Sequence, residues 1–259
     1  MPGYDSSKRQ LVVAMDHGRA LGAIAGLEDP GRVVEMVVEA GADAIMTSFG
    51  VIKRYRDRLI GRIPTLLRVD GGPSRYREDW LKYTEWGLLH TVDDARHLGV
   101  DGLCCMVFMG GEVEVASLEI TALLAGECLH DGLPLMVEAL PCPSERIPDP
   151  NDAQAMADAC RLGFEHGADV LKTYATGSAD SFRKVVAGCP APVLIAGGPK
   201  MDSERAVLQV VRDTLDAGGM GVVFGRNIWQ SPQPAKMIKA LRHLIHADGS
   251  VDEAGELLR

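Results

Sequence analysis

The sequence of 259 residues lacks both a run of basic side chains and a long apolar stretch. It has 27 basic and 36 acidic side chains, for a net charge of −9, which argues against binding to nucleic acid or to an anionic membrane. No stretch of 18 apolar residues occurs and residues 1–10 are polar, which argues against a membrane-spanning helix or a signal peptide. We therefore expect a cytoplasmic protein whose partner is a small molecule.

The sequence also lacks any Cys-x-x-Cys pair. Its cysteines therefore follow no spacing typical of a zinc site or a disulfide framework, and most lie in or beside apolar runs. We expect the six cysteines to be reduced and mostly buried: Cys104, Cys105, Cys128, Cys142, Cys160 and Cys189.

Short apolar runs recur along the chain about every 30 residues, which is the length of one strand-plus-helix unit. There are eight such runs, at residues 11–15, 44–47, 65–69, 102–108, 135–139, 170–173, 193–196 and 221–224. The segments between them have helical spacing, as at Val207, Val211 and Leu215. Eight strand–helix units predict a (β/α)8 TIM barrel that forms one domain over residues 1–259. A doubly wound sheet is the alternative, although no Gly-x-Gly-x-x-Gly turn follows the first run.

A Gly-x-Asp motif precedes three of the predicted strands. Asp43, Asp101 and Asp169 each follow a glycine that ends a helical segment. They lie at the N-terminal ends of strands, whereas catalytic groups in a TIM barrel lie at the C-terminal ends. We therefore interpret these three aspartates as structural residues that stabilise turns.

One lysine, Lys172, lies within a predicted strand and is expected to point into the barrel. Burial disfavours the charged form of an ammonium group, and a neutral amine attacks carbonyl carbon. One interpretation is therefore a lysine that forms a Schiff base. The other is a lysine that forms a salt bridge inside the barrel with Asp16 or Glu138.

Glycines and cations follow the last two predicted strands. Gly197, Gly198 and Lys200 come after the seventh strand, and Gly225 and Arg226 come after the eighth. Bare backbone N–H groups with nearby cations at these two loops are typical of the phosphate site of this architecture. Either glycine pair alone would also fit a tight turn. Together the loops predict a phosphorylated substrate.

Carboxylates lie at or near other strand ends. Asp16 follows the first strand and Glu138 is assigned to the end of the fifth, so either can move a proton to or from a substrate hydroxyl. Asp70 is a weaker candidate, because Asp-Gly-Gly is also a turn sequence. His17 is a candidate substrate-binding residue or a hydrogen-bonded scaffold residue. We expect no metal, although Asp16 and Glu138 leave a magnesium site open as an alternative.

The longest irregular stretch covers residues 71–91 and is rich in aromatic side chains. It contains Tyr76, Trp80, Tyr83 and Trp86. We expect this segment to cap the site or to contact a neighbouring subunit.

Four motifs together resemble one known family, the class I Schiff-base aldolases of the DeoC/LacD type. This group includes archaeal-type fructose-bisphosphate aldolase and tagatose-bisphosphate aldolase. The motifs are Ala14-Met15-Asp16-His17-Gly18, Leu171-Lys172-Thr173-Tyr174, Ile195-Ala196-Gly197-Gly198-Pro199-Lys200 and Gly225-Arg226-Asn227-Ile228-Trp229-Gln230. They occur in the family's order, and the resemblance covers nearly the whole chain.

The resemblance implies that Lys172 forms the imine and that Asp16 positions or deprotonates the substrate. It further implies that Gly197, Gly198, Gly225 and Arg226 hold a phosphate. The sequence departs from the archaeal-type enzymes after the fifth strand, where they have a tyrosine as proton donor. Glu138 instead resembles the acid/base glutamate of the tagatose-bisphosphate type.

The expected reaction is the cleavage or formation of a phosphorylated ketose through a lysine imine with dihydroxyacetone phosphate, without any other cofactor. Lys200 is expected to bind phosphate or to act on Lys172 by charge repulsion. A thiolase-like acyl transferase, another aldol-type synthase on a phosphorylated ketone and a non-catalytic sugar-phosphate-binding barrel are the alternatives. Family habit and the aromatic segment favour a homo-oligomer.

Overall fold

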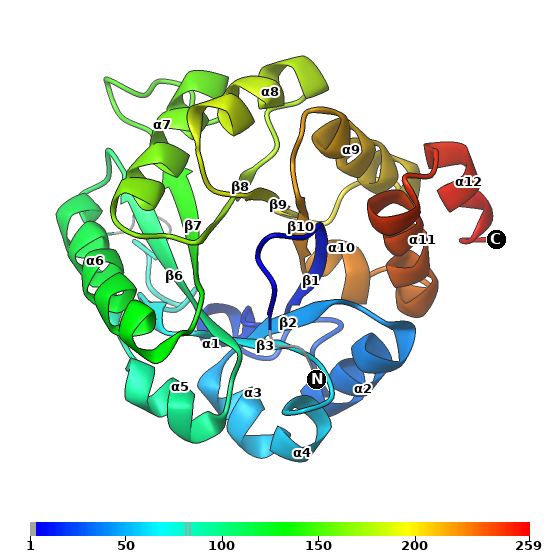
Figure 1. Ribbon diagram of the computed structural model, residues 1–259, viewed down its shortest axis with the longest axis horizontal. Coiled ribbons are helices and arrows are strands. Elements are labelled where there is room, and N and C mark those ends of the chain that lie inside the picture. The colour runs from blue at the N-terminus through cyan, green and yellow to red at the C-terminus, as the bar shows by residue number, and fades with distance from the viewer. Residues whose placement is uncertain (1–3, 81, 83) are drawn as a thin grey trace.

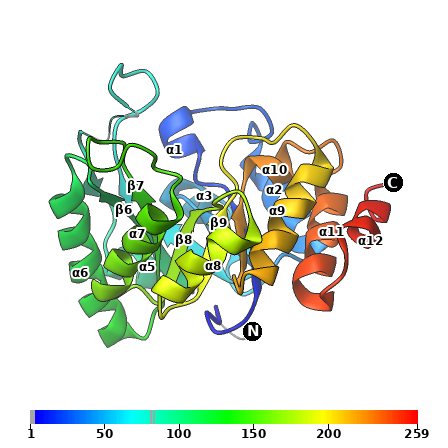
Figure 2. The same cartoon turned by 90° about the horizontal axis from the view of Figure 1, so that it is seen from above.

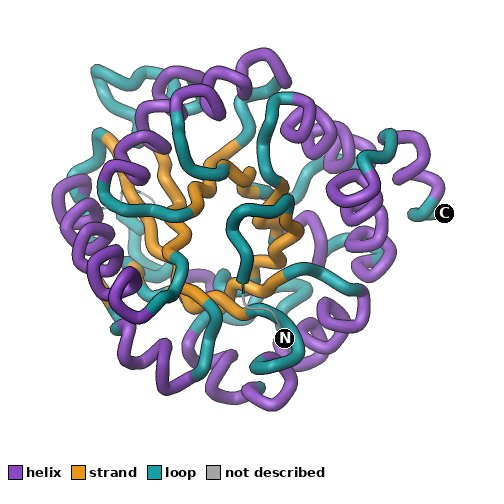
Figure 3. Tube along the Cα trace, viewed as in Figure 1, coloured by secondary structure: helices purple, strands orange, loops and turns teal. Residues whose placement is uncertain are grey.

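The computed structural model describes residues 4–80, 82 and 84–259. Eight parallel strands close into a barrel in the order β1-β10-β9-β8-β7-β6-β3-β2, and helices surround them (Figures 1 and 3). The barrel strands are β1 Gln10–Ala14, β2 Ala44–Thr47, β3 Thr65–Arg68, β6 Gly102–Met109, β7 Leu135–Pro141, β8 Val170–Tyr174, β9 Val193–Ala196 and β10 Gly221–Phe224. Each coincides with one of the eight apolar runs to within a few residues, and the predicted (β/α)8 TIM barrel is confirmed.

Most of the helices pack against the outside of the strands through apolar side chains, whereas α1 buries none of its residues. In α9, for example, Val207, Val211 and Leu215 are buried, as their spacing predicts. The helices are α1 Gly18–Leu21, α2 Pro30–Ala40, α3 Phe49–Arg54, α4 Arg56–Leu59, α5 Val92–Leu98, α6 Glu114–Asp131, α7 Ala153–Glu165, α8 Ala179–Gly188, α9 Glu204–Asp216, α10 Arg226–Trp229, α11 Pro234–Ala247 and α12 Val251–Glu256. No helix of the described part is long and apolar enough to cross a membrane.

The segment at residues 71–91 was predicted to be irregular, but its described part contains regular structure at the base. Two short strands, β4 Asp70–Gly71 and β5 Gly87–Leu88, pair in an antiparallel ladder that closes the base of the loop. Figure 2 shows this loop, in cyan, at the same end of the barrel as α1 and opposite the N-terminus. Tyr76 is exposed and Trp86 is half-buried, while Tyr83 lies outside the described residues.

Inside the barrel, an apolar layer lies on the N-terminal side of the charged residues of the site. Alternate strand residues point inward and pack together there. The members are Val12, Ala14, Ala44, Met46, Leu66, Cys104, Met136, Val170, Leu194 and Val223. Tyr4, from the segment before β1, packs against this layer. The next inward positions along β3, β7 and β8, two residues further on, are polar, and they form the floor of the site.

The three aspartates of the Gly-x-Asp motif hold the N-terminal ends of the strands together. Asp43 accepts a hydrogen bond from Leu11 N, Asp101 from Thr65 N and Asp169 from Leu135 N, at 2.6, 2.9 and 2.8 Å. In each case the aspartate lies just before one strand and binds the start of the preceding one. Their predicted structural role is confirmed. All six cysteines are also free and buried, as expected.

We expect Asp101→Ala to lower the free energy of unfolding by about 1–2 kcal/mol, because it leaves the N–H of Thr65 without its carboxylate acceptor. Urea unfolding measures the change. Asp101→Asn keeps an acceptor oxygen and should lose less stability than Asp101→Ala. Glu119→Ala, an exposed position on α6, is the matched control and should match wild type. Equal losses in the alanine and asparagine variants would contradict this role.

Candidate functional site

Lys172 and Glu138 form an ion pair inside the barrel. The two residues are register partners on β8 and β7, and Lys172 Nζ lies 2.9 Å from Glu138 Oε2. Both are buried, at 6% and 8% exposed. The inward orientation predicted for Lys172 is therefore present, together with the salt bridge considered as the second interpretation. Glu138 is not at the end of its strand as expected, because β7 stays paired with β6 as far as Pro141.

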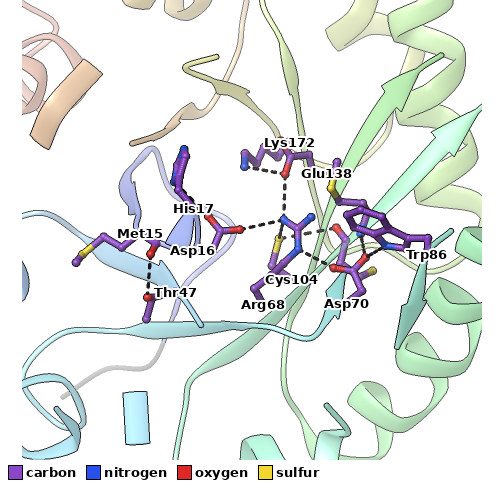
Figure 4. A network of polar contacts seen from close by, with 12 residues as sticks. Met15, Asp16, His17, Thr47, Arg68, Asp70, Trp86, Cys104, Glu138 and Lys172 are labelled. Atoms are coloured by element: carbon purple, nitrogen blue, oxygen red, sulfur yellow. Dashed lines mark hydrogen bonds and ion pairs between the residues drawn. The ribbon is translucent and has the colours of Figure 1, made fainter. Parts of the chain in front are cut away.

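Arg68 lies at the centre of a cluster of charged side chains that also contains Asp16, Asp70, Glu138 and Lys172. It was not singled out from the sequence. Its Nη1 lies 3.0 Å from Glu138 Oε2 and 3.5 Å from Asp16 Oδ2, and its Nε lies 2.6 Å from Asp70 Oδ1 (Figure 4). The side chain is 2% exposed. A basic residue within a buried apolar run is the same signal that identified Lys172, so alternation along β3 would have found Arg68.

Asp70 connects the charged cluster to the loop of residues 71–91. It is fully buried and accepts hydrogen bonds from Trp86 Nε1 at 2.7 Å and from Met106 N at 2.6 Å, in addition to Arg68. Asp70 is thus an anchor for the loop and for Arg68 rather than only a turn residue.

The cations of the cluster keep its carboxylates ionised. Burial acts to raise the pKa of Asp16, but the charges of Arg68 and Lys172 outweigh it and lower that pKa to about 2. Burial likewise opposes ionisation of Glu138, and Lys172 and Arg68 together lower its pKa. Both carboxylates are therefore proton acceptors near neutral pH.

His17 lies between Asp16 and the turn after β10. Its Nδ1 is 3.6 Å from Asp16 Oδ1, and its ring meets the edge of Trp229 with centroids 5.2 Å apart. A side chain on Gly225 would collide with the ring of His17, so the glycine is needed for this packing as well as for an open loop. Burial lowers the pKa of His17, which favours the neutral imidazole.

The loops after β9 and β10 form one unit. Asn227 Nδ2 donates to Gly197 O at 2.8 Å, and Met201 N donates to Asn227 Oδ1 at 2.8 Å. Gly197, Gly198 and Lys200 line a groove with a volume of ≈ 690 Å³, and Lys200 is exposed on its rim. Gly198 has a φ of +60°, a conformation that favours glycine.

Arg226 begins α10 beside these loops. Its Nε is buried and makes no hydrogen bond to the described residues, so a donor is available there for an acceptor from outside the protein.

Tyr174 joins the groove to the buried cluster, and it was quoted in a motif but not singled out from the sequence. It lies two residues after Lys172 on β8 and therefore points to the same side of the strand. It also lines the groove with Gly197 and Gly198. Burial and the charge of Glu138 raise the pKa of Tyr174 to about 12, so the phenol keeps its proton.

The space between Asp16 and Glu138 is occupied by the guanidinium of Arg68. The described ranges contain no group of three or more His, Cys, Asp or Glu placed to hold a metal ion. The residues present suit acid–base and amine chemistry, and they do not fit the magnesium alternative.

The chain matches the family model of the DeoC/LacD family aldolases over residues 10–231. It is 33% identical to an uncharacterised aldolase of Saccharolobus solfataricus over 257 residues, which cover 97% of this chain and 94% of that protein. It is 31% identical to a 3-hydroxy-5-phosphonooxypentane-2,4-dione thiolase of Salmonella paratyphi A over 252 residues, which cover 97% of this chain and 82% of that protein.

The fold is also similar to a solved structure of an archaeal fructose-1,6-bisphosphate aldolase, in which the catalytic lysine is covalently bound to the carbinolamine intermediate. The TM-score is 0.84 at 27% sequence identity, with 92% of this chain and 94% of that chain covered.

We expect Arg68→Met to lower the free energy of unfolding by about 3–5 kcal/mol at pH 8, because it leaves three buried carboxylates without their shared cation. The loss of stability should shrink towards pH 4.5, because Asp16 and Glu138, whose pKa values Arg68 helps to lower, take up protons more readily in the variant. The wild type should keep this stabilisation until the pH falls below about 4 towards the pKa of Asp16, about 2. Urea unfolding at pH 8, 6 and 4.5 tests both statements.

Arg68→Lys keeps one positive charge but loses the planar guanidinium. Its free energy of unfolding should lie between those of the wild type and of Arg68→Met. Arg77→Met, which removes an exposed arginine from the loop, is the matched control. If the stability lost in Arg68→Met does not vary with pH, Arg68 acts through packing and not through its charge.

Proposed function

The chain belongs to the DeoC/LacD family of aldolases, and from this premise we propose that it is a class I aldolase that acts through an imine on Lys172. Its substrate is a phosphorylated ketose similar to fructose bisphosphate, and one product is dihydroxyacetone phosphate. The observation that carries the proposal is the pairing of a buried amine with a carboxylate at 2.9 Å, beside loops suited to phosphate.

Imine formation begins with the loss of a proton from Lys172. Glu138 Oε2, at 2.9 Å, is the acceptor within reach. The neutral amine adds to the C2 ketone. Glu138 then returns its proton to the carbinolamine hydroxyl, which leaves as water to give a protonated imine and restores the carboxylate. Arg68 stays bound to Asp16 and Asp70 during these proton transfers, so the cluster keeps a compensating cation.

The imine then draws electrons from the bond that breaks. Glu138, or Asp16 across the Arg68 guanidinium, removes the proton from the C4 hydroxyl, and the C3–C4 bond breaks to release an aldehyde. The remaining enamine takes up a proton at C3, and water hydrolyses the imine to release dihydroxyacetone phosphate and the free amine. The reverse sequence is condensation.

The phosphate of the ketone half binds in the unit formed by the loops after β9 and β10. Gly197 and Gly198 line the groove, and Arg226, directly after Gly225, offers a buried Nε without a partner among the described residues. Lys200 adds positive charge on the rim.

A thiolase-like acyl transfer by the same lysine is the second candidate. It is favoured by the 31% identity to the thiolase of Salmonella paratyphi A, which is close to the 33% identity to the aldolase relative. Turnover that requires coenzyme A would support this candidate over the aldolase.

Borohydride reduction in the presence of dihydroxyacetone phosphate should attach one reduced substrate unit to the peptide that contains Lys172. Lys172→Met should abolish both the adduct and turnover, because no other lysine lies in the buried cluster. Intact mass and peptide mapping give the readout. Lys200→Met removes an exposed lysine and should still form the adduct. An adduct on another lysine, or full turnover by Lys172→Met, would refute the scheme.

Arg226→Ala should raise KM for the phosphorylated ketose about 30-fold, which corresponds to the loss of about 2 kcal/mol from one charged hydrogen bond. Steady-state kinetics measures the effect. With dihydroxyacetone, which lacks the phosphate, the variant and wild type should show the same kcat/KM for condensation. Equal losses with both substrates would place the phosphate elsewhere.

A further inference from the structure

The outward face of α6 carries apolar side chains that the described part of the chain leaves uncovered. Of the six large hydrophobic residues exposed in the described ranges, three lie on this helix: Val115, Leu123 and Leu129, at 65%, 54% and 85%. Figures 1 and 2 show α6 at the outer edge of the barrel. Its inward face is already packed through Leu124 and Cys128. A helix that is apolar on both faces is normally covered on both.

Gly126 lies on this outward face, although the packing of the chain itself does not require a glycine there. A Cβ at Gly126 would meet nothing within 4 Å in the described chain outside its own helical backbone. Glycine within a helix is unfavourable relative to alanine, so its presence needs another reason. Two grooves with volumes of ≈ 570 and ≈ 500 Å³ are both lined by Gly126, one beside α5 and the other beside residues 132–134. The helix is therefore thinnest where the surface beside it is hollow.

Four residues three or four positions apart form the centre of this exposed face of α6. They are Glu119, Leu123, Gly126 and His130. Neither Glu119 nor His130 forms an ion pair in the described part of the chain, whereas the neighbouring Asp131 pairs with α5. The face thus has a carboxylate at one end, an imidazole at the other, and a leucine beside a glycine between them.

This arrangement is complementary to itself when two copies of the helix lie antiparallel. In a two-fold contact every pair of facing residues occurs twice. The register that sets Glu119 opposite the partner's His130 also sets Leu123 opposite the partner's Gly126, because both pairs are centred on the same point of the helix. A carboxylate then meets an imidazole at both ends, and each leucine enters the space left by a glycine.

We propose that this face of α6 binds the same face of a second copy of the chain in an antiparallel two-fold contact. The exposed leucines supply apolar area at the centre, and the pairs of Glu119 with His130 fix the orientation. The contact lies outside the barrel and includes no residue of the charged cluster. The inference therefore goes beyond the proposed aldolase function and does not depend on it.

Sedimentation velocity over a range of protein concentrations tests the contact. Wild type should form dimers, or a larger assembly that the variants divide into smaller units. His130→Glu sets like charges opposite each other twice and should raise the Kd for association about 100-fold. Adding Glu119→Lys to the same chain restores opposite charges and should recover most of the affinity. A wild type that stays monomeric, or a double variant that associates as weakly as His130→Glu, would overturn the proposal.

Two further variants test the leucine and the glycine. Leu123→Glu should abolish the contact, and Leu257→Glu is its matched control, because Leu257 is exposed just after α12, across the molecule from α6 in Figure 1. Gly126→Leu should also abolish the contact by filling the space for the partner's leucine. The chain itself has room for this side chain, so urea unfolding of the Gly126→Leu monomer should show no loss of stability. If Leu123→Glu or Gly126→Leu keeps the wild-type Kd, or if Leu257→Glu weakens association equally, this face of α6 is not the contact.

Discussion

Three carboxylates surround one guanidinium in the interior of the barrel, and the site depends on this arrangement. Burial resists the ionisation of Asp16 and Glu138, and the cations Arg68 and Lys172 lower the pKa of both carboxylates. Arg68 contacts these two carboxylates and also Asp70. The planar fork of an arginine also fixes the directions in which they can lie. Arg68 therefore orients the carboxylate of Glu138, which in turn pairs with Lys172.

The rigid part of the site and its recognition surfaces come from different parts of the fold. Arg68, Glu138 and Lys172 project from barrel strands, whose pairing allows little movement. The glycines after β9 and β10 and the guanidinium of Arg19 come from the connections that follow strands. The bond from Asp70 to Trp86 joins the two parts, because one carboxylate holds both Arg68 and the ring beneath Arg19.

The stabilising residues at the two ends of the barrel act in different ways. At the N-terminal end Asp43, Asp101 and Asp169 bind backbone N–H groups and join neighbouring strands. At the C-terminal end Asp16 and Glu138 bind the side-chain cations of Arg68 and Lys172. Since backbone donors are fixed and side-chain cations can exchange protons or partners, only the second end suits chemistry.

The sequence by itself determined the eight strands, the barrel, the inward lysine and the glycine-containing loops after β9 and β10, because each depends on local spacing or on one residue in its own strand. Only the tertiary structure decided which groups meet. That Glu138 faces Lys172 follows from the register of β7 and β8. That Arg68 reaches both Asp16 and Glu138 follows from the strand order, which places β3 two strands from β1 on one side and two from β7 on the other. The place of Arg19 beside Trp86 depends on how a loop folds back against α1, which no local pattern encodes.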